Sequence, residues 1–144
     1  MPFNRTGFVE SLTDSRLSWF TGTAYSAAPA SLYIGLYSGL PLSDGSGGNE
    51  IVRVGPVAFG APQTLPGGPA WPTTRFIQPT AAVSVNPGGV AAPGAHFDFT
   101  GYGIFSQASG GTPVYTGSWA GELLAGVATT LTAQTFRIFA EQPS

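Results

Sequence analysis

The chain has 144 residues, of which 42% are hydrophobic and 12% aromatic, and this length suits a single domain with a core of its own. Only 8% of the residues are charged, the formal net charge is −2, and cysteine is absent. This composition excludes disulfides and thiolate metal sites, and it lacks the basic surface that nucleic-acid binding requires.

Glycine and proline are abundant, with 21 and 13 residues. Such a content can indicate disorder, but the many aromatic residues favour a packed core. We therefore predict one all-β domain over residues 1–144, an antiparallel sandwich or jelly-roll-like fold with one N-terminal α-helix. No run of about 18 apolar residues indicates a transmembrane helix, so we expect no membrane partner.

The scarcity of charge also bears on the surface of the protein. Five arginines are present and no lysine, although exposed strand edges are commonly protected by lysine. A surface so poor in charge favours association, so we expect a homo-oligomer in which neighbouring subunits cover much of each chain. The alternative is a monomer kept in solution by its serine, threonine, asparagine and glutamine side chains.

A single helix is predicted over about residues 6–20. Phe8, Leu12, Trp19 and Phe20 recur at helical spacing and place apolar side chains on one side. Thr6 or Asn4 can cap its start, and Gly22 follows its end. Two interpretations stay open for the apolar side: it packs on its own domain, or it lies across a neighbouring subunit.

The remaining segments alternate between apolar stretches and turns rich in glycine and proline, which is typical of a sandwich or barrel. Gly35 lies within a clearly alternating strand and indicates a close backbone approach or a bend, and Pro56 marks an edge strand or a bulge. The predicted strands cover about residues 31–37, 50–59, 80–85, 96–105, 112–119, 129–132 and 135–140, with a turn over 121–126.

The hairpin from His96 to Trp119 is the strongest single pattern in the chain. An aromatic strand, a Gly-rich turn and a return strand follow one another there. We expect its aromatic side chains to form the core and its glycines to permit close packing. The hairpin is therefore predicted to be the scaffold, with function in the helix and loops that it carries.

Little in the sequence points to catalysis. His96 is the only histidine, and Asp98 shares its strand face, but a catalytic site also needs a nucleophile, an oxyanion donor or a second titrating group. Asp44, Asn49 and Glu50 do not have the spacing of an EF-hand loop. We expect no enzyme activity, no cofactor and no metal site.

The order of elements resembles that of small virion structural proteins of tailed bacteriophages, which are described as head decoration proteins or tail fibre proteins. The matching segments cover most of the chain in order, except residues 60–94, which are richer in proline and glycine than the family pattern. They are Thr21–Pro29, Leu32–Tyr37, Asp44-Gly45, Glu50, Arg53-Val54, Gly101–Phe105, Gly110-Gly111 and Val114–Gly117.

The resemblance implies a virion protein, made in the host cytoplasm and located on the capsid surface. We expect a capsid decoration or cement protein that binds the major capsid protein and itself, with a trimer preferred because capsid shells offer threefold positions. Residues 1–5 lack the features of a signal peptide. The expected partner-binding residues are Phe8, Leu12, Trp19, Phe20, Leu40 and Trp71.

Two of these expectations have alternatives. Trp71 is either an interface anchor in a Pro-rich loop or a side chain packed over the end of the sandwich. The whole chain is either a cement protein or a tail-tip or tail-fibre component that recognises a host surface glycan, with Trp71, Tyr37 and Tyr25 stacking on sugars.

Overall fold

In the computed structural model the chain is described over residues 7–24, 28–42, 44–68, 74–87 and 96–140. A five-stranded antiparallel sheet forms one layer, in the order β1-β8-β7-β2-β3. In chain order its strands are β1 (Gly7–Phe8), β2 (Leu32–Gly39), β3 (Asn49–Val57), β7 (His96–Phe105) and β8 (Tyr115–Leu124).

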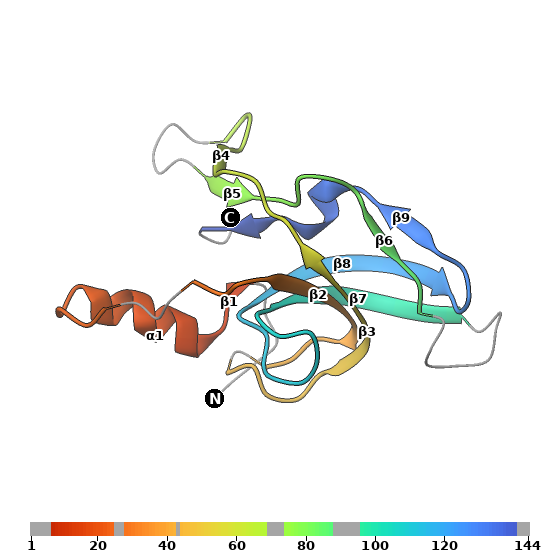
Figure 1. Cartoon of the computed structure of the whole chain (residues 1–144), viewed down its shortest axis with the longest axis horizontal. Helices are drawn as coiled ribbons and strands as arrows, with labels where there is room; N and C mark the ends of the chain where they lie inside the picture. The colour runs from red at the N-terminus through yellow and green to blue at the C-terminus, as the bar shows by residue number, and fades with distance from the viewer. Residues whose placement is uncertain (1–6, 25–27, 43, 69–73, 88–95, 141–144) are drawn as a thin grey trace.

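Two short sheets lie over one face of this main sheet (Figure 1). One has the order β10-β5-β4 and the other pairs β6 with β9. Their strands are β4 (Gln63–Thr64), β5 (Arg75–Ile77), β6 (Val83–Val85), β9 (Thr129–Leu131) and β10 (Ile138–Phe139), and the 3-10 helix η1 (Ala133–Phe136) joins β9 to β10.

The core fills the space between the two layers. The main sheet contributes alternate side chains from β2, β7 and β8, and the second layer contributes side chains from β6, η1 and β10. The expected all-β fold with one helix is confirmed, and its layers are sandwich-like. The buried hydrophobic cluster consists of Ile34, Leu36, Val83, Val85, Phe99, Tyr102, Ile104, Tyr115, Leu123, Phe136 and Ile138.

The β7–β8 hairpin is the scaffold, as predicted, and β7 has the predicted bounds. The return strand does not end at Trp119, however, because β8 continues to Leu124. Gly121 is not part of a turn: it pairs with Phe99 inside the strand. A Cβ atom there would lie 2.6 Å from the Trp119 ring, so this glycine makes room for an aromatic side chain within the ladder.

The last predicted strand, 135–140, is also wrong in its first half. Residues 133–136 form η1, and only Ile138–Phe139 pair, with β5. Phe136 is fully buried and meets Tyr102 edge-on at a ring distance of 5.3 Å. Phe136 and Ile138 both lie in the buried cluster.

The helix α1 spans Glu10–Trp19, which is shorter than the predicted range of 6–20. Its N-cap residue is Val9, and no side chain caps the start. The expected caps Thr6 and Asn4 lie outside the described residues. The strand β1, which the sequence did not suggest, takes up Gly7 and Phe8 because both residues pair with β8.

The other strands lie close to their predicted ranges, although 80–85 shortens to Val83–Val85. β3 is an edge of the main sheet, which confirms the interpretation of Pro56. The short strands β4 and β5 were not predicted, because two or three residues between prolines carry too little alternation to be recognised.

Candidate interaction surface

The helix α1 projects from the body of the protein instead of packing on it (Figure 1). None of its residues is buried. The chain is anchored just before it, where Val9 is 3% exposed and its amide donates to the Val114 carbonyl at 3.1 Å. We call residues 10–24 the helical arm.

The tip of the arm carries three large apolar side chains in contact with water. Leu17, Trp19 and Phe20 are 61%, 55% and 80% exposed. The rings of Trp19 and Phe20 meet edge-on at 5.2 Å, which is a favourable geometry for an aromatic pair. Exposed apolar groups that gather in this way mark interaction sites in soluble proteins.

The arm also ends in a defined conformation. The Phe20 amide donates to the Leu17 carbonyl at 3.1 Å, and the Thr21 hydroxyl donates to the Ser18 carbonyl at 2.7 Å. Gly22, at φ +91°, then turns the chain out of the helix. The aromatic pair is therefore held in place without help from the body of the protein.

The expected partner-binding residues divide into three groups. Trp19 and Phe20 lie together at the tip, joined by Leu17, which was not expected. Phe8 lies at the root of the arm against Tyr115, at a ring distance of 5.1 Å, and Leu12 is half-buried. Leu40 covers Gly101 on the main sheet, and Trp71 lies outside the described residues.

Exposure of Leu17 could not be read from helical spacing. The pattern placed Phe8, Leu12 and Trp19 on one side and left open whether that side packs on its own domain or on a neighbouring subunit. In the structure the Arg16 guanidinium lies 4.9 Å from the centre of the Phe8 ring, so the root of the arm closes on itself. Among the residues that the structure describes, Leu17, Trp19 and Phe20 at the tip stay largely exposed.

A second candidate surface lies over the face of the main sheet that is turned away from the second layer, where an ion pair within β3 holds the β7–β8 loop. Arg53 Nε lies 2.8 Å from Glu50 Oε2, and the two side chains are 9% and 26% exposed. The same guanidinium donates to the carbonyls of Gln107 and Gly110 at 2.9 and 2.8 Å. It also lies 3.4 Å from the centre of the Phe105 ring.

The clamp depends on space above Gly35. A Cβ atom on Gly35 would collide with the Glu50 carboxylate and lie 2.8 Å from the Phe105 ring. The prediction of a close approach at this glycine is confirmed. Tyr37 stacks on Phe105 at 6.3 Å, and burial, with a contribution from Glu50, raises the pKa of Tyr37 to about 12.

The clamp holds the β7–β8 loop, residues 106–112, on β3, and this loop also touches the β2–β3 loop. A Cβ atom on Gly45 would lie 3.2 Å from Thr112 Cβ, so the two loops touch. Within the β2–β3 loop, Asp44 accepts hydrogen bonds from the Ser46 amide and hydroxyl at 2.9 and 2.6 Å. These bonds lower the pKa of Asp44. We call this surface the clamped loop pair.

Tyr37 is 4% exposed and cannot stack on a sugar as proposed for the tail-fibre alternative. Its ring lies beneath the clamp, against Phe105. The other two residues expected for sugar stacking, Tyr25 and Trp71, lie outside the described residues. The alternative therefore loses one of its three named residues.

His96 lies at the far end of the β7–β8 hairpin, and its partner is not Asp98. Its Nδ1 contacts Glu122 Oε1, on the neighbouring strand. Both side chains are more than half exposed, and exposed ion pairs of this kind contribute little to stability. Across the described ranges, no three His, Asp or Glu side chains gather closely enough to hold a metal ion.

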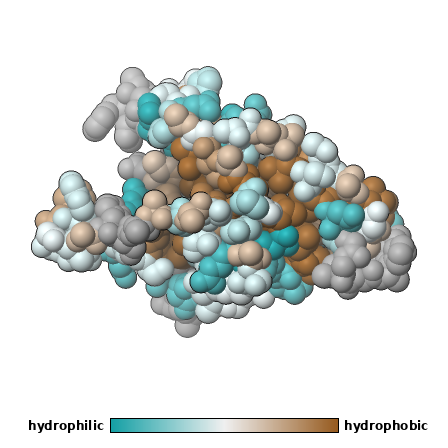
Figure 2. Space-filling view, in the orientation of Figure 1, coloured by the Kyte–Doolittle hydropathy of each residue, from teal (hydrophilic) through white to brown (hydrophobic). Residues whose placement is uncertain are grey.

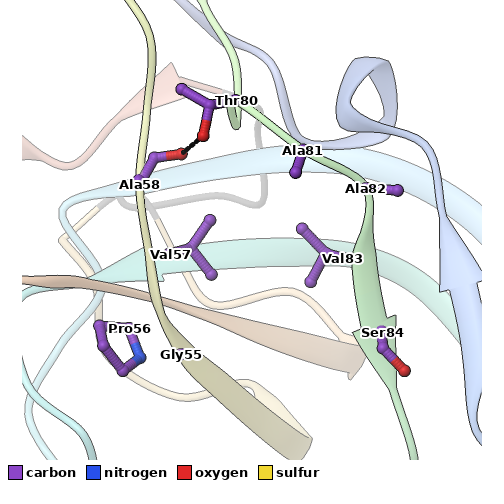
Figure 3. A pocket seen from close by; sticks show the side chains of 9 residues that line it. All are labelled: Gly55, Pro56, Val57, Ala58, Thr80, Ala81, Ala82, Val83 and Ser84. Atoms are coloured by element: carbon purple, nitrogen blue, oxygen red, sulfur yellow. Dashed lines mark hydrogen bonds between the residues drawn. The ribbon is translucent and has the colours of Figure 1, made fainter.

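A third feature is a cavity of about 390 Å³ between two strand edges. One wall contains residues 55–58 and the other residues 80–84. The walls are joined beside Ala58, because the Thr80 amide donates to the Ala58 carbonyl at 2.9 Å and Phe59 forms an isolated antiparallel β-bridge with Pro79. Beyond that point the walls diverge, and Val57 and Val83 face each other across the opening (Figure 3). We call this hollow the edge groove; it is lined by Gly55, Pro56, Val57, Ala58, Thr80, Ala81, Ala82, Val83 and Ser84.

Comparisons with protein-family models, with curated proteins and with solved structures found no match to this chain. In the part of the chain that the structure describes, no helix has both the length and the apolar character needed to cross a membrane. The candidate surfaces therefore rest on their own geometry.

Proposed function

We propose that the chain is a structural protein of a bacteriophage virion, a capsid decoration or cement protein that binds the major capsid protein shell and copies of itself. The observation that carries this proposal is the helical arm, which presents Leu17, Trp19 and Phe20 to water at its tip. The sequence resemblance to small virion proteins of tailed phages supplies the setting.

The geometry suits attachment better than chemistry. The body is a two-layer β scaffold, and the arm extends beyond it (Figure 1). Binding to another protein would remove the apolar surface of the aromatic pair from water. A specific interface buries about 1,200–2,000 Å² of accessible surface in total. Many copies on one shell add avidity to each weak contact.

Electron microscopy of virions labelled through this chain tests the location. We expect density at regular positions over the head. Heads that lack the chain should rupture at a lower temperature than complete heads, and they should also be less resistant to low salt. Adding back the wild-type protein should restore the heads, whereas the W19S/F20S variant should not. Density confined to the tail would overturn the cement assignment.

The tail alternative, recognition of a host surface glycan, is favoured by one observation, the clamped loop pair. Its β7–β8 loop, residues 106–112, is exposed throughout, and the Arg53 guanidinium holds it in one conformation, as a preorganised recognition surface requires. Glycan-array binding by the isolated protein, lost in Arg53→Ala and kept in W19S/F20S, would support this alternative.

A further inference from the structure

We propose that the helical arm of one copy docks its Trp19–Phe20 tip into the edge groove of a second copy, so that the chains associate head to tail in a closed ring. The inference rests on the self-association part of the proposed function and names its contact surfaces. It does not depend on what else the protein binds.

The arm and the groove lie at opposite edges of the main sheet. The arm follows β1, the groove begins at β3, and the sheet order is β1-β8-β7-β2-β3. Four strand spacings separate these edges, about 19 Å. In Figure 1 the arm leads away from the sheet at the β1 side, so its tip points away from the groove of the same chain. Only the groove of a second copy is then within its reach.

The two surfaces are chemically matched. Residues 17–24 of the arm carry no charged side chain, and neither do the residues that line the groove. Gly55 and the alanines add little bulk to the groove, and Val57 and Val83 face each other across it (Figure 3). Apolar side chains reach the surface in the middle of this face of the body (Figure 2).

The groove also offers polar backbone groups. Among the described strands, β3 pairs only with β2, and β6 pairs only with β9, so beyond the Thr80–Ala58 bond the groove is flanked by one open edge of each of these strands. Free carbonyl groups on such an edge are acceptors. The Trp19 indole N–H needs an acceptor when it is buried, which favours an aromatic occupant with one donor over a purely aliphatic one.

The area of one contact explains why a ring is expected. A fully covered aromatic side chain buries about 150–250 Å², so Trp19 and Phe20, at 55% and 80% exposure, offer about 270 Å². Together with the matching groove surface, one contact buries about 550 Å², below the 1,200 Å² of a typical specific interface. In a closed ring every copy gives one arm and receives one. The last contact then forms within a single assembly, where the effective concentration of the two surfaces is high, and this strengthens the whole ring.

A head-to-tail contact between different surfaces makes a ring when its rotation closes and a filament when it does not. Two copies that exchange arms make the smallest ring, a twofold pair in which the arm of each copy fills the groove of the other. The trimer expected from capsid geometry is a larger ring of the same kind.

The first test measures mass in solution by light scattering, for the full chain across a range of concentrations. We expect a closed oligomer of two or more chains for the wild type. W19S/F20S removes the arm tip and Ala81→Trp fills the groove, and each should reduce the mass to that of one chain. Ala128→Trp, an identical change at an exposed turn outside the groove, should leave the oligomer intact.

The second test identifies the contact. The chain lacks cysteine, so a single thiol-linked photo-crosslinker at Thr23→Cys, an exposed position just beyond the tip, labels one place and leaves Trp19 and Phe20 intact. When labelled and ¹⁵N-enriched chains are mixed, crosslinked peptides should join position 23 of one copy to residues at or near 55–58 or 80–84 of another. A monomeric wild type, an oligomer that survives Ala81→Trp, or crosslinks to other segments would each overturn the proposal.

The two parts of the function fail separately. A wild-type chain that is monomeric would contradict both this contact and self-association. Regular density on virion heads would still support binding to the shell in that case. Conversely, a ring with the expected crosslinks and no density on virions would leave the arm contact standing without the cement role.

Discussion

The helical arm and the β7–β8 hairpin are both rich in large apolar side chains, yet their surroundings are opposite. In the hairpin, Phe99, Tyr102, Ile104 and Tyr115 are between 0% and 3% exposed. In the arm, Phe20 is 80% exposed. Apolar residues in the first region stabilise the fold, whereas those in the second are available to a partner, so substitutions in the two regions should affect different measurements.

The largest effect on stability is expected at the centre of the hairpin. Ile104 is fully buried between the two layers, so Ile104→Ala leaves a cavity and should lower the free energy of unfolding by about 2–5 kcal/mol. Urea denaturation monitored by tryptophan fluorescence measures this. A decrease in the free energy of unfolding below about 0.5 kcal/mol, as is usual for substitutions at exposed positions, would show that the core rearranges to fill the cavity.

The next largest effect is expected at the clamp. Arg53→Ala leaves the Glu50 carboxylate half-buried without its partner and releases the carbonyls of Gln107 and Gly110. Removing one member of a buried pair costs about 3 kcal/mol at the lower end of the observed range. Hydrogen exchange should also speed up in residues 106–112.

Arg75→Ala provides the control for the clamp variant. Arg75 is exposed and bonds to Thr64 Oγ1 at 2.9 Å, so its loss should change stability by less than about 0.5 kcal/mol. Equal losses for the two arginines would contradict the clamp.

Alkaline pH should weaken the fold through its buried tyrosines. Burial raises the pKa of Tyr37 to about 12, against about 10 in an unfolded chain. The folded state therefore favours the neutral phenol, and this stabilisation is complete below pH 10 and lost as the pH rises toward 12. Burial also raises the pKa values of Tyr102 and Tyr115.

The urea midpoint at several pH values between 9 and 12 measures this decline. Tyr37→Phe cannot ionise at this position and should show a shallower decline than the wild type, while Tyr102 and Tyr115 still contribute. Identical curves for the two proteins would rule out a role for Tyr37.

The smallest effect on stability is expected in the arm. No residue of α1 is buried, so W19S/F20S should alter the free energy of unfolding of the single chain by less than about 0.5 kcal/mol. If the same variant lost 2 kcal/mol or more at a concentration where the chain is monomeric, the arm would have to pack on its own body, and the comparison with the hairpin would fail.

The sequence by itself determined the fold class and its central hairpin. Alternation of apolar and polar residues over Leu32–Tyr37 and His96–Phe105 is local, and it reports which side chains share a face of a strand. The close approach at Gly35 and the edge position of Pro56 were also visible, because glycine and proline restrict the backbone in known ways. The existence of one helix near the N-terminus was predictable because apolar residues recur there at helical spacing.

Only the tertiary structure decided what covers each face. Helical spacing marked an apolar side on α1 but could not show that nothing packs on its tip, and Gly121 looked like a turn until Trp119 was found above it. The clamp joins Arg53 to residues 54 and 57 positions further along the chain, and the edge groove forms where β3 and residues 80–84 diverge. These features depend on pairing between distant segments, which no local pattern encodes.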